Sequence, residues 1–136
     1  MPRILVVDDE EQIRRILRLT LERAGHEVDT AADGNEAVAR FDPARHDLVI
    51  TDIVMPEKEG IETIQELRQK SAGVKIIAIS GGGRISPEEY LDWAKRFGVH
   101  CTFTKPIDRD DLLRTVADLT GAPKRFAQSR YSSGLM

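Results

Sequence analysis

The chain has 136 residues, of which 40% are hydrophobic and 32% charged, and its formal net charge is −3 at pH 7. This length suits one compact domain, and the composition argues against a disordered chain and against a nucleic-acid-binding protein, which needs a basic surface. A single cysteine excludes an internal disulfide, and no apolar run approaches the length of a membrane span, so we expect a cytoplasmic protein without membrane contact.

Two strand–helix units are predicted in the first half of the chain. Residues 4–7 form a continuous apolar run, which indicates a strand buried on both faces. The following helix is expected to end at Gly25. Its apolar stripe consists of Ile13, Ile16, Leu17, Leu21 and Ala24. After a second strand at residues 28–32, Asp33 and Glu36 have the spacing of a capping box and open a second helix.

Three further units complete the pattern. Ser86, Pro87 and Glu89 form a strong helix start, and Asp108 is placed to cap the last helix. The remaining strands are predicted at residues 48–51, 74–79 and 99–104. Strands alternating with helices in this way predict an α/β fold: a doubly wound, five-stranded parallel sheet with helices on both faces. Residues 1–120 form this domain, and residues 121–136 read as a tail too short for an output domain.

Polar residues stand where the predicted strands end. Because a doubly wound sheet binds ligands outside the carboxyl ends of its strands, these residues are expected to share one crevice. They are Asp8, Asp9, Asp52, Ser80 and Lys105. Two carboxylates about 4 Å apart repel by roughly 4 kcal/mol at an effective dielectric near 20. Mg²⁺ and a lysine would relieve this repulsion, so the crevice suits a phosphoryl group.

The residue types at the strand ends limit which side chain could act as the nucleophile in such a crevice. No Ser-His-Asp or Cys-His arrangement can be read from the sequence, and His26, His46 and His100 lie away from the strand ends as surface or packing residues. The remaining candidate is a carboxylate, which can form an acyl phosphate.

Four sequence elements together resemble the receiver domain of response regulators over residues 3–119. They are ILVVDDE at the start, LVITDIVMPEKEG around Asp52, IIAISG ending near Ser80, and TKPI containing Lys105-Pro106. The resemblance implies a (βα)₅ flavodoxin-like fold and a phosphoprotein that takes part in two-component signal transduction or a phosphorelay.

The resemblance also implies a role for each matching residue. Asp52 is the phosphoacceptor, Asp9 binds Mg²⁺ directly, and Asp8 does so directly or through water. Mn²⁺ is a possible substitute for Mg²⁺. The backbone carbonyl of Val54 completes the metal ligands. The phosphoryl oxygens are bound by Ser80, Lys105 and the amide of Gly81. The Lys105–Pro106 peptide bond is expected to be cis.

The implied partners are proteins. The phosphoryl donor is a histidine kinase or a histidine phosphotransfer protein. The output is expected on a face formed by the fourth helix, the fifth strand and the fifth helix, with no direct nucleic-acid contact. The chain is expected as a monomer or a phosphorylation-dependent dimer. It is not an enzyme beyond catalysing its own phosphorylation and dephosphorylation.

The sequence departs from the family pattern at Thr102, where an aromatic switch residue is usual. Phe103 is adjacent, but strand alternation makes it face the other way. We therefore expect activation to change residues 81–86, which include three glycines, more than the Thr102 side chain.

Other readings remain open at this point. The chain could be a non-phosphorylated pseudo-receiver, which would normally have lost a key acid or the lysine. It could be an aspartate-nucleophile phosphatase, although such enzymes usually place the second acid two residues after the nucleophile. Asp9 could partly serve as a helix cap.

Overall fold

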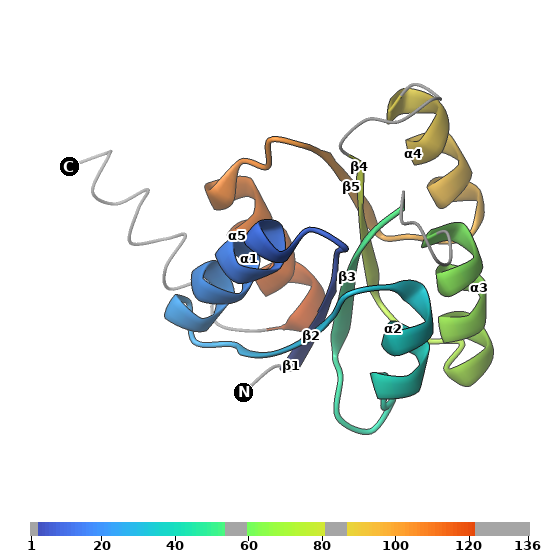
Figure 1. Ribbon diagram of the computed structural model, residues 1–136, viewed down its shortest axis with the longest axis horizontal. Coiled ribbons are helices and arrows are strands. Elements are labelled where there is room, and N and C mark those ends of the chain that lie inside the picture. Colours follow the sequence, from blue (N-terminus) through green and yellow to red (C-terminus); the bar gives the residue numbers. More distant parts are fainter. Residues whose placement is uncertain (1–2, 54–59, 81–86, 122–136) are drawn as a thin grey trace.

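The computed structural model describes residues 3–53, 60–80 and 87–121, and for residues 87, 90, 91, 93 and 94 the backbone alone. Five strands and five helices alternate strictly along this part of the chain (Figure 1). The strands are β1 (Arg3–Val7), β2 (Glu27–Ala31), β3 (Leu48–Asp52), β4 (Ile76–Ser80) and β5 (Cys101–Thr104). The helices are α1 (Glu11–Arg23), α2 (Gly34–Arg40), α3 (Gly60–Lys70), α4 (Pro87–Arg96) and α5 (Arg109–Thr120).

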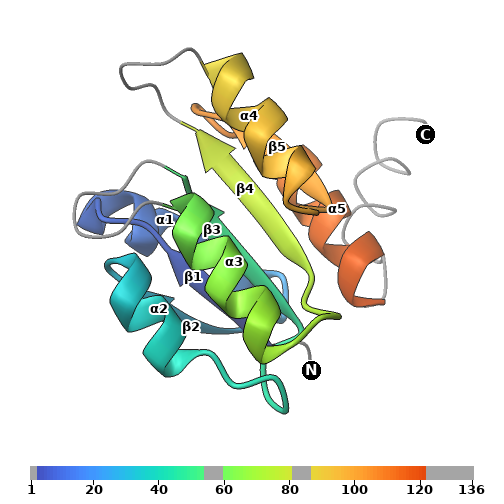
Figure 2. The ribbon, with the colours of Figure 1, turned by 90° about the vertical axis from the view of Figure 1, so that its right-hand side faces the viewer.

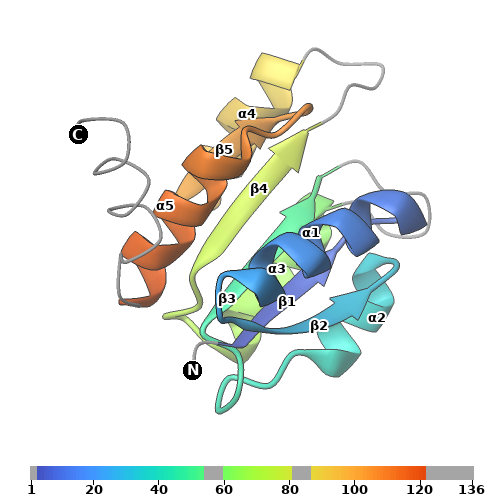
Figure 3. The same ribbon diagram turned by 90° about the vertical axis from the view of Figure 1, so that its left-hand side faces the viewer.

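The strands form one sheet in the order β2-β1-β3-β4-β5, and every pair is parallel. Helices α2, α3 and α4 cover one face (Figure 2), and α1 and α5 cover the other (Figure 3). This arrangement confirms the predicted doubly wound α/β fold. Among the described residues, no helix has both the length and the apolar character needed to cross a bilayer.

Each face of the sheet buries its own apolar cluster, so the strands are apolar on both sides. Under α2 and α3 the cluster includes Leu5, Val49, Ile53, Ile64, Leu67 and Ile76. Under α1 and α5 it includes Ile4, Val6, Leu21, Ile50, Ile77, Ile79 and Leu112. The two clusters hold β1, β3 and β4 rigidly in the centre, and these strands carry the residues of interest at their carboxyl ends.

Local signals at the helix ends behave largely as expected. The Asp33 and Asp108 side chains accept hydrogen bonds from the amides of Glu36 and Asp111, at 2.8 and 3.0 Å. Gly25, which follows the cap residue Ala24 of α1, has φ +95°, a conformation that favours glycine. The Glu36 carboxylate accepts from the Ala32 amide rather than from that of Asp33, so the capping box is incomplete. Ser86 lies outside the described residues.

The structure corrects several details of the predicted elements. Ile16 is 58% exposed and lines hollows between α1 and α5, so it is not part of the core. The fourth and fifth strands begin two residues later than predicted. Val74 and Val99 caused this error because they pack into the core without belonging to a strand.

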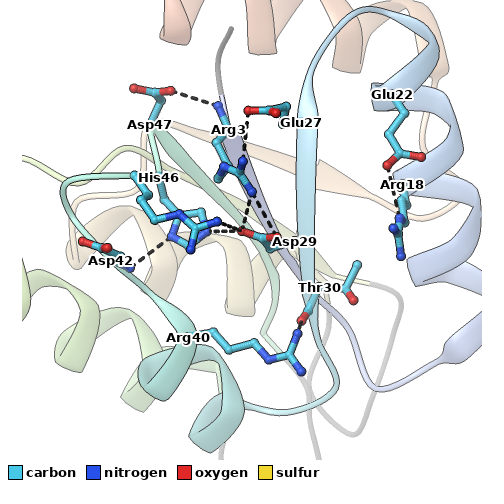
Figure 4. A network of polar contacts seen from close by, with 11 residues as sticks. Arg3, Arg18, Glu22, Glu27, Asp29, Thr30, Arg40, Asp42, His46 and Asp47 are labelled. Carbon is cyan, nitrogen blue, oxygen red and sulfur yellow. Dashed lines mark hydrogen bonds and ion pairs between the residues drawn. The ribbon is translucent and has the colours of Figure 1, made fainter.

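A polar network links the amino ends of the first three strands (Figure 4). The buried His46 ring accepts a hydrogen bond from the Asp42 amide at Nδ1, so its Nε2 carries a proton and donates to Asp29 at 2.8 Å. Arg3 donates to both Asp29 carboxylate oxygens at 3.3 Å. His26 and His100 directly precede β2 and β5, and His46 lies two residues before β3, so all three histidines lie at the amino ends of the strands, opposite the predicted site.

The Asp29 network predicts a stability change in acid. Burial raises the pKa of Asp29, but hydrogen bonds from His46 and Arg3 outweigh it and hold the pKa below the ordinary 3.8. Asp29 therefore stabilises the fold above about pH 4, and this contribution is lost as the pH falls through its lowered pKa. We expect Asp29→Asn to lower the free energy of unfolding by about 1–2 kcal/mol at pH 7. The variant should also lose less stability than wild type as the pH is lowered. Urea unfolding between pH 7 and pH 3 measures this. The exposed Asp92→Asn variant is the control, and equal pH profiles for the two variants would contradict the assignment.

Candidate functional site

The parallel sheet brings three distant parts of the chain to one edge. Asp8 follows β1, Asp52 is the last residue of the neighbouring β3, and Lys105 follows β5. The side chains of Asp8 and Asp52 are almost fully buried, whereas Asp9 is exposed. The predicted convergence of these residues at the carboxyl ends of the strands is therefore observed.

Lys105 is the cation of this site. Its Nζ lies 3.0 Å from Asp52 Oδ2, 3.1 Å from Asp8 Oδ2 and 3.2 Å from Glu10 Oε1. Burial lowers the pKa of Lys105, but its hydrogen bond with Asp52 and the charges of Asp52 and Asp8 raise it well above the usual range. The lysine is thus a permanent positive charge at neutral pH.

Asp8 shows how strongly negative charge accumulates here. Burial raises its pKa to about 6, and the Asp52 charge adds to this effect, although a hydrogen bond from the Glu10 amide and the charge of Lys105 oppose it. Asp8 Oδ2 is buried and has no hydrogen bond among the described residues, its ion pair with Lys105 aside. Because Asp8 shares this single ammonium group with Asp52 and Glu10, the three carboxylates together exceed the positive charge that Lys105 supplies.

The acidic residues fit a hard divalent cation. Asp8, Asp9, Glu10 and Asp52 each offer one oxygen, and these oxygens all lie within 4.8 Å of one another. Carboxylates at this spacing suit Mg²⁺, which takes few protein ligands and keeps several waters. The under-satisfied Asp8 oxygen supports the same assignment. Val54, the expected backbone ligand, lies outside the described residues.

Ser80 ends β4 at the same edge of the sheet. Its hydroxyl oxygen is buried and has no hydrogen-bond partner among the described residues. The Ser80 carbonyl accepts a hydrogen bond from the Lys105 amide at 2.9 Å, which holds the end of β4 beside the residue that follows β5. A buried, unpaired hydroxyl is costly unless a ligand uses it.

Two backbone contacts fix the positions of the carboxylates. Arg14 on α1 donates to the Asp8 carbonyl at 2.7 Å. Gly60 at the start of α3 donates to the Ile53 carbonyl at 3.0 Å. A Cβ at Gly60 would lie 2.3 Å from Ile53 Cα and 2.5 Å from the Asp52 carbonyl oxygen. Only glycine therefore lets α3 approach the Asp52 backbone this closely.

The remaining predicted residues have mixed outcomes. The Lys105–Pro106 peptide bond is cis, as the resemblance implies. Phe103 packs against the core under α1 and α5, and strand alternation then predicts that Thr102 faces the other side of the sheet. Gly81 and the loop 81–86 lie outside the described residues. The cap of α1 is Glu10 without a capping side chain, so Asp9 does not cap that helix.

Sequence reasoning missed the roles of Glu10, Arg14 and Gly60. Glu10 directly follows Asp8-Asp9 at a strand end, and this position was a usable signal. Gly60 stands within the motif around Asp52, but nothing in the residue pattern shows that it faces the Asp52 backbone. The Arg14 contact depends on how α1 is docked and has no local signal.

Comparisons with known proteins agree with this geometry. The family model of the response regulator receiver domain matches residues 4–117. The chain is 35% identical to the chemotaxis protein CheY of Halobacterium salinarum, over 88% of this chain and 97% of that protein. It is 44% identical to the transcriptional regulatory protein ResD of Bacillus subtilis, over 95% of this chain but only 51% of that protein.

Solved structures give the same result. The chemotaxis protein CheY4 of Vibrio cholerae superimposes with a TM-score of 0.78 at 36% identity, covering 88% of this chain and 98% of that one. The response regulator TrrA of Thermotoga maritima, solved with Mg²⁺ and BeF, gives 0.76 at 37% identity, covering 88% and 99%.

The raised pKa of Asp8 predicts an unusual dependence of stability on pH. Without divalent cations, Asp8 favours folding below its unfolded pKa of 3.8, and this contribution is lost as the pH rises through about 6. We expect Asp8→Asn to raise the unfolding free energy at pH 7.5 in EDTA by roughly 1–3 kcal/mol. Mg²⁺ should stabilise wild type more at pH 7.5 than at pH 5, and it should stabilise Asp8→Asn less than wild type. Urea unfolding at each pH, in Mg²⁺ and in EDTA, measures these differences. A wild type whose stabilisation by Mg²⁺ does not depend on pH would contradict the assignment.

The close approach of Gly60 predicts a second effect. Gly60→Ala must displace the backbone of Asp52 and Ile53, so we expect it to cost about 1–3 kcal/mol although alanine is the better helix former. Gly73→Ala is the matched control because a Cβ there has no atom within 4 Å. Chemical denaturation compares the two variants, and equal stabilities would show that the contact is not tight.

Proposed function

Because the chain belongs to the response regulator receiver family of two-component signalling, we propose that its Asp52 carboxylate accepts a phosphoryl group from a phosphohistidine. A carboxylate oxygen of Asp52 forms the new P–O bond, and the P–N bond to the donor imidazole breaks. The proton needed by the leaving imidazole comes from the donor side or from solvent. The observation that carries this proposal is the buried Asp52 at 3.0 Å from Lys105, within the acidic cluster.

The residues of the chain supply positioning and charge. Phosphoryl transfer needs mainly in-line placement of the reactants and neutralisation of charge on the phosphoryl oxygens. Lys105 is held at the Asp52 carboxylate and is the natural partner of one such oxygen. The unpaired Ser80 hydroxyl is the donor proposed for another. The Gly81 amide is proposed for a third, and Gly81 lies outside the described residues.

The metal site is proposed at the same cluster. Asp8, Asp9 and Asp52 would hold Mg²⁺, which when bound neutralises the carboxylates and the phosphoryl oxygens. TrrA, which shares the fold at 37% identity, was solved with Mg²⁺ and BeF and supports this choice of cation.

The signalling role is proposed from the same family membership. The donor is a histidine kinase or a histidine phosphotransfer protein, and the phosphorylated state acts on a partner protein through the face of α4, β5 and α5. The chain is proposed to catalyse only its own phosphorylation and dephosphorylation, and to make no direct nucleic-acid contact. Since the chain spans about half of ResD, the activity of the whole protein is part of this proposal.

Intact-mass spectrometry after incubation with acetyl phosphate tests the chemistry directly. We expect wild type to gain one phosphoryl group in Mg²⁺ and none in EDTA. Asp52→Asn should lose the adduct, because an amide is not a nucleophile at neutral pH. The control Asp92→Asn should label like wild type. An unlabelled wild type, beside a receiver that labels, would favour the pseudo-receiver alternative.

A further inference from the structure

Glu10 is a third carboxylate on Lys105 that the proposed chemistry does not use. Its Oε1 lies 3.2 Å from Lys105 Nζ, but its side chain is 60% exposed, whereas those of Asp8 and Asp52 are 1% and 5% exposed. Glu10 occupies the cap position of α1, yet its side chain caps no amide there. Among the described contacts, the Glu10 side chain therefore does not stabilise the start of α1.

Lys105 has three close carboxylate partners. Its Nζ donates hydrogen bonds to Asp52 Oδ2 at 3.0 Å and to Glu10 Oε1 at 3.2 Å, and it forms an ion pair with Asp8 Oδ2 at 3.1 Å. A phosphoryl oxygen arriving at Asp52 therefore competes with these carboxylates for the ammonium group. Asp8 and Asp52 are buried beside Lys105 and would lose their counterion without gaining water. Glu10 is exposed, so water can hydrate its carboxylate when it leaves Lys105, and it is the partner most easily released.

Glu10 also adds charge where an anion must enter. Its carboxylate belongs to the group of four acidic oxygens within 4.8 Å of one another, and it is one of the two exposed members, with Asp9. An incoming phosphoryl donor is negatively charged, so it meets the repulsion of Glu10 before it reaches Lys105.

We propose that Glu10 is a positioning residue that holds Lys105 in the resting protein and competes with the phosphoryl group for it. Glu10 thereby weakens the binding of phosphoryl donors without taking part in the bond exchange at Asp52. This inference rests on the proposed phosphorylation of Asp52.

The Glu10→Gln variant tests the competition, because it keeps the shape of the side chain and removes its charge. The matched control is Glu11→Gln, which makes the same charge change one residue further on, at an exposed position with no described contact to Lys105. Rates of acetyl phosphate labelling are measured at saturating Mg²⁺ over a range of donor concentrations. The affinity for beryllofluoride, which involves no covalent transfer, is measured in parallel.

We expect Glu10→Gln to lower the KM for acetyl phosphate and the Kd for beryllofluoride about threefold to tenfold, with little change in the maximal rate. The difference should shrink at high salt, since Glu10 is exposed. Glu11→Gln should stay close to wild type.

Equal effects of the two variants would overturn the inference in favour of a general charge effect, and a change in the maximal rate alone would overturn it too. Normal labelling of wild type with no Glu10 effect refutes this inference and leaves the proposed function standing. A wild type that neither labels nor binds beryllofluoride refutes both.

Discussion

The structure depends on one cation placed among buried carboxylates. Lys105 neutralises Asp8 and Asp52 at a sheet edge where neither acid could be buried alone without a large cost. The three residues are far apart in the sequence, so the ion pairs also tie β1, β3 and the segment after β5 into one unit. The sheet in turn explains the site, because parallel strands present their carboxyl ends together and apolar layers on both faces keep them from moving apart.

The charge balance at this edge is incomplete. One lysine faces Asp8, Asp52 and Glu10, with Asp9 close by, and the pKa of Asp8 is raised to about 6 as a result of burial and of the Asp52 charge. A protein optimised only for stability would have replaced one of these acids. The proposed divalent cation and phosphoryl group would together account for the excess negative charge and for the Ser80 hydroxyl, which has no hydrogen-bond partner among the described residues. The opposite edge differs, because Asp29 there is fully paired by His46 and Arg3.

The order of elements and the convergence of Asp8, Asp52 and Lys105 could be predicted because they follow from hydrophobic periodicity and from the geometry of parallel sheets. Strand ends were less predictable, since Val74 and Val99 contribute to the core without pairing in the sheet. Ile16 matched the helical stripe yet lies in the open between α1 and α5, because periodicity does not show how far a neighbouring helix reaches. The contacts of Gly60 and Arg14 arise from the docking of α3 and of α1, and no local pattern contains that information. The contact of Glu10 with Lys105 did have a local signal, because Glu10 directly follows Asp8 and Asp9 at a strand end.

The raised pKa of Asp8 has a consequence for the lifetime of the protein in a cell. A proteolytic enzyme cleaves chains that open transiently, and the population of open chains rises when the folded state is destabilised. At neutral pH the acidic edge destabilises the cation-free fold, whereas any ion or phosphoryl group bound there stabilises it by mass action. The abundance of the protein would then follow the supply of its own ligands, because chains with a filled site are degraded more slowly than chains with an empty one.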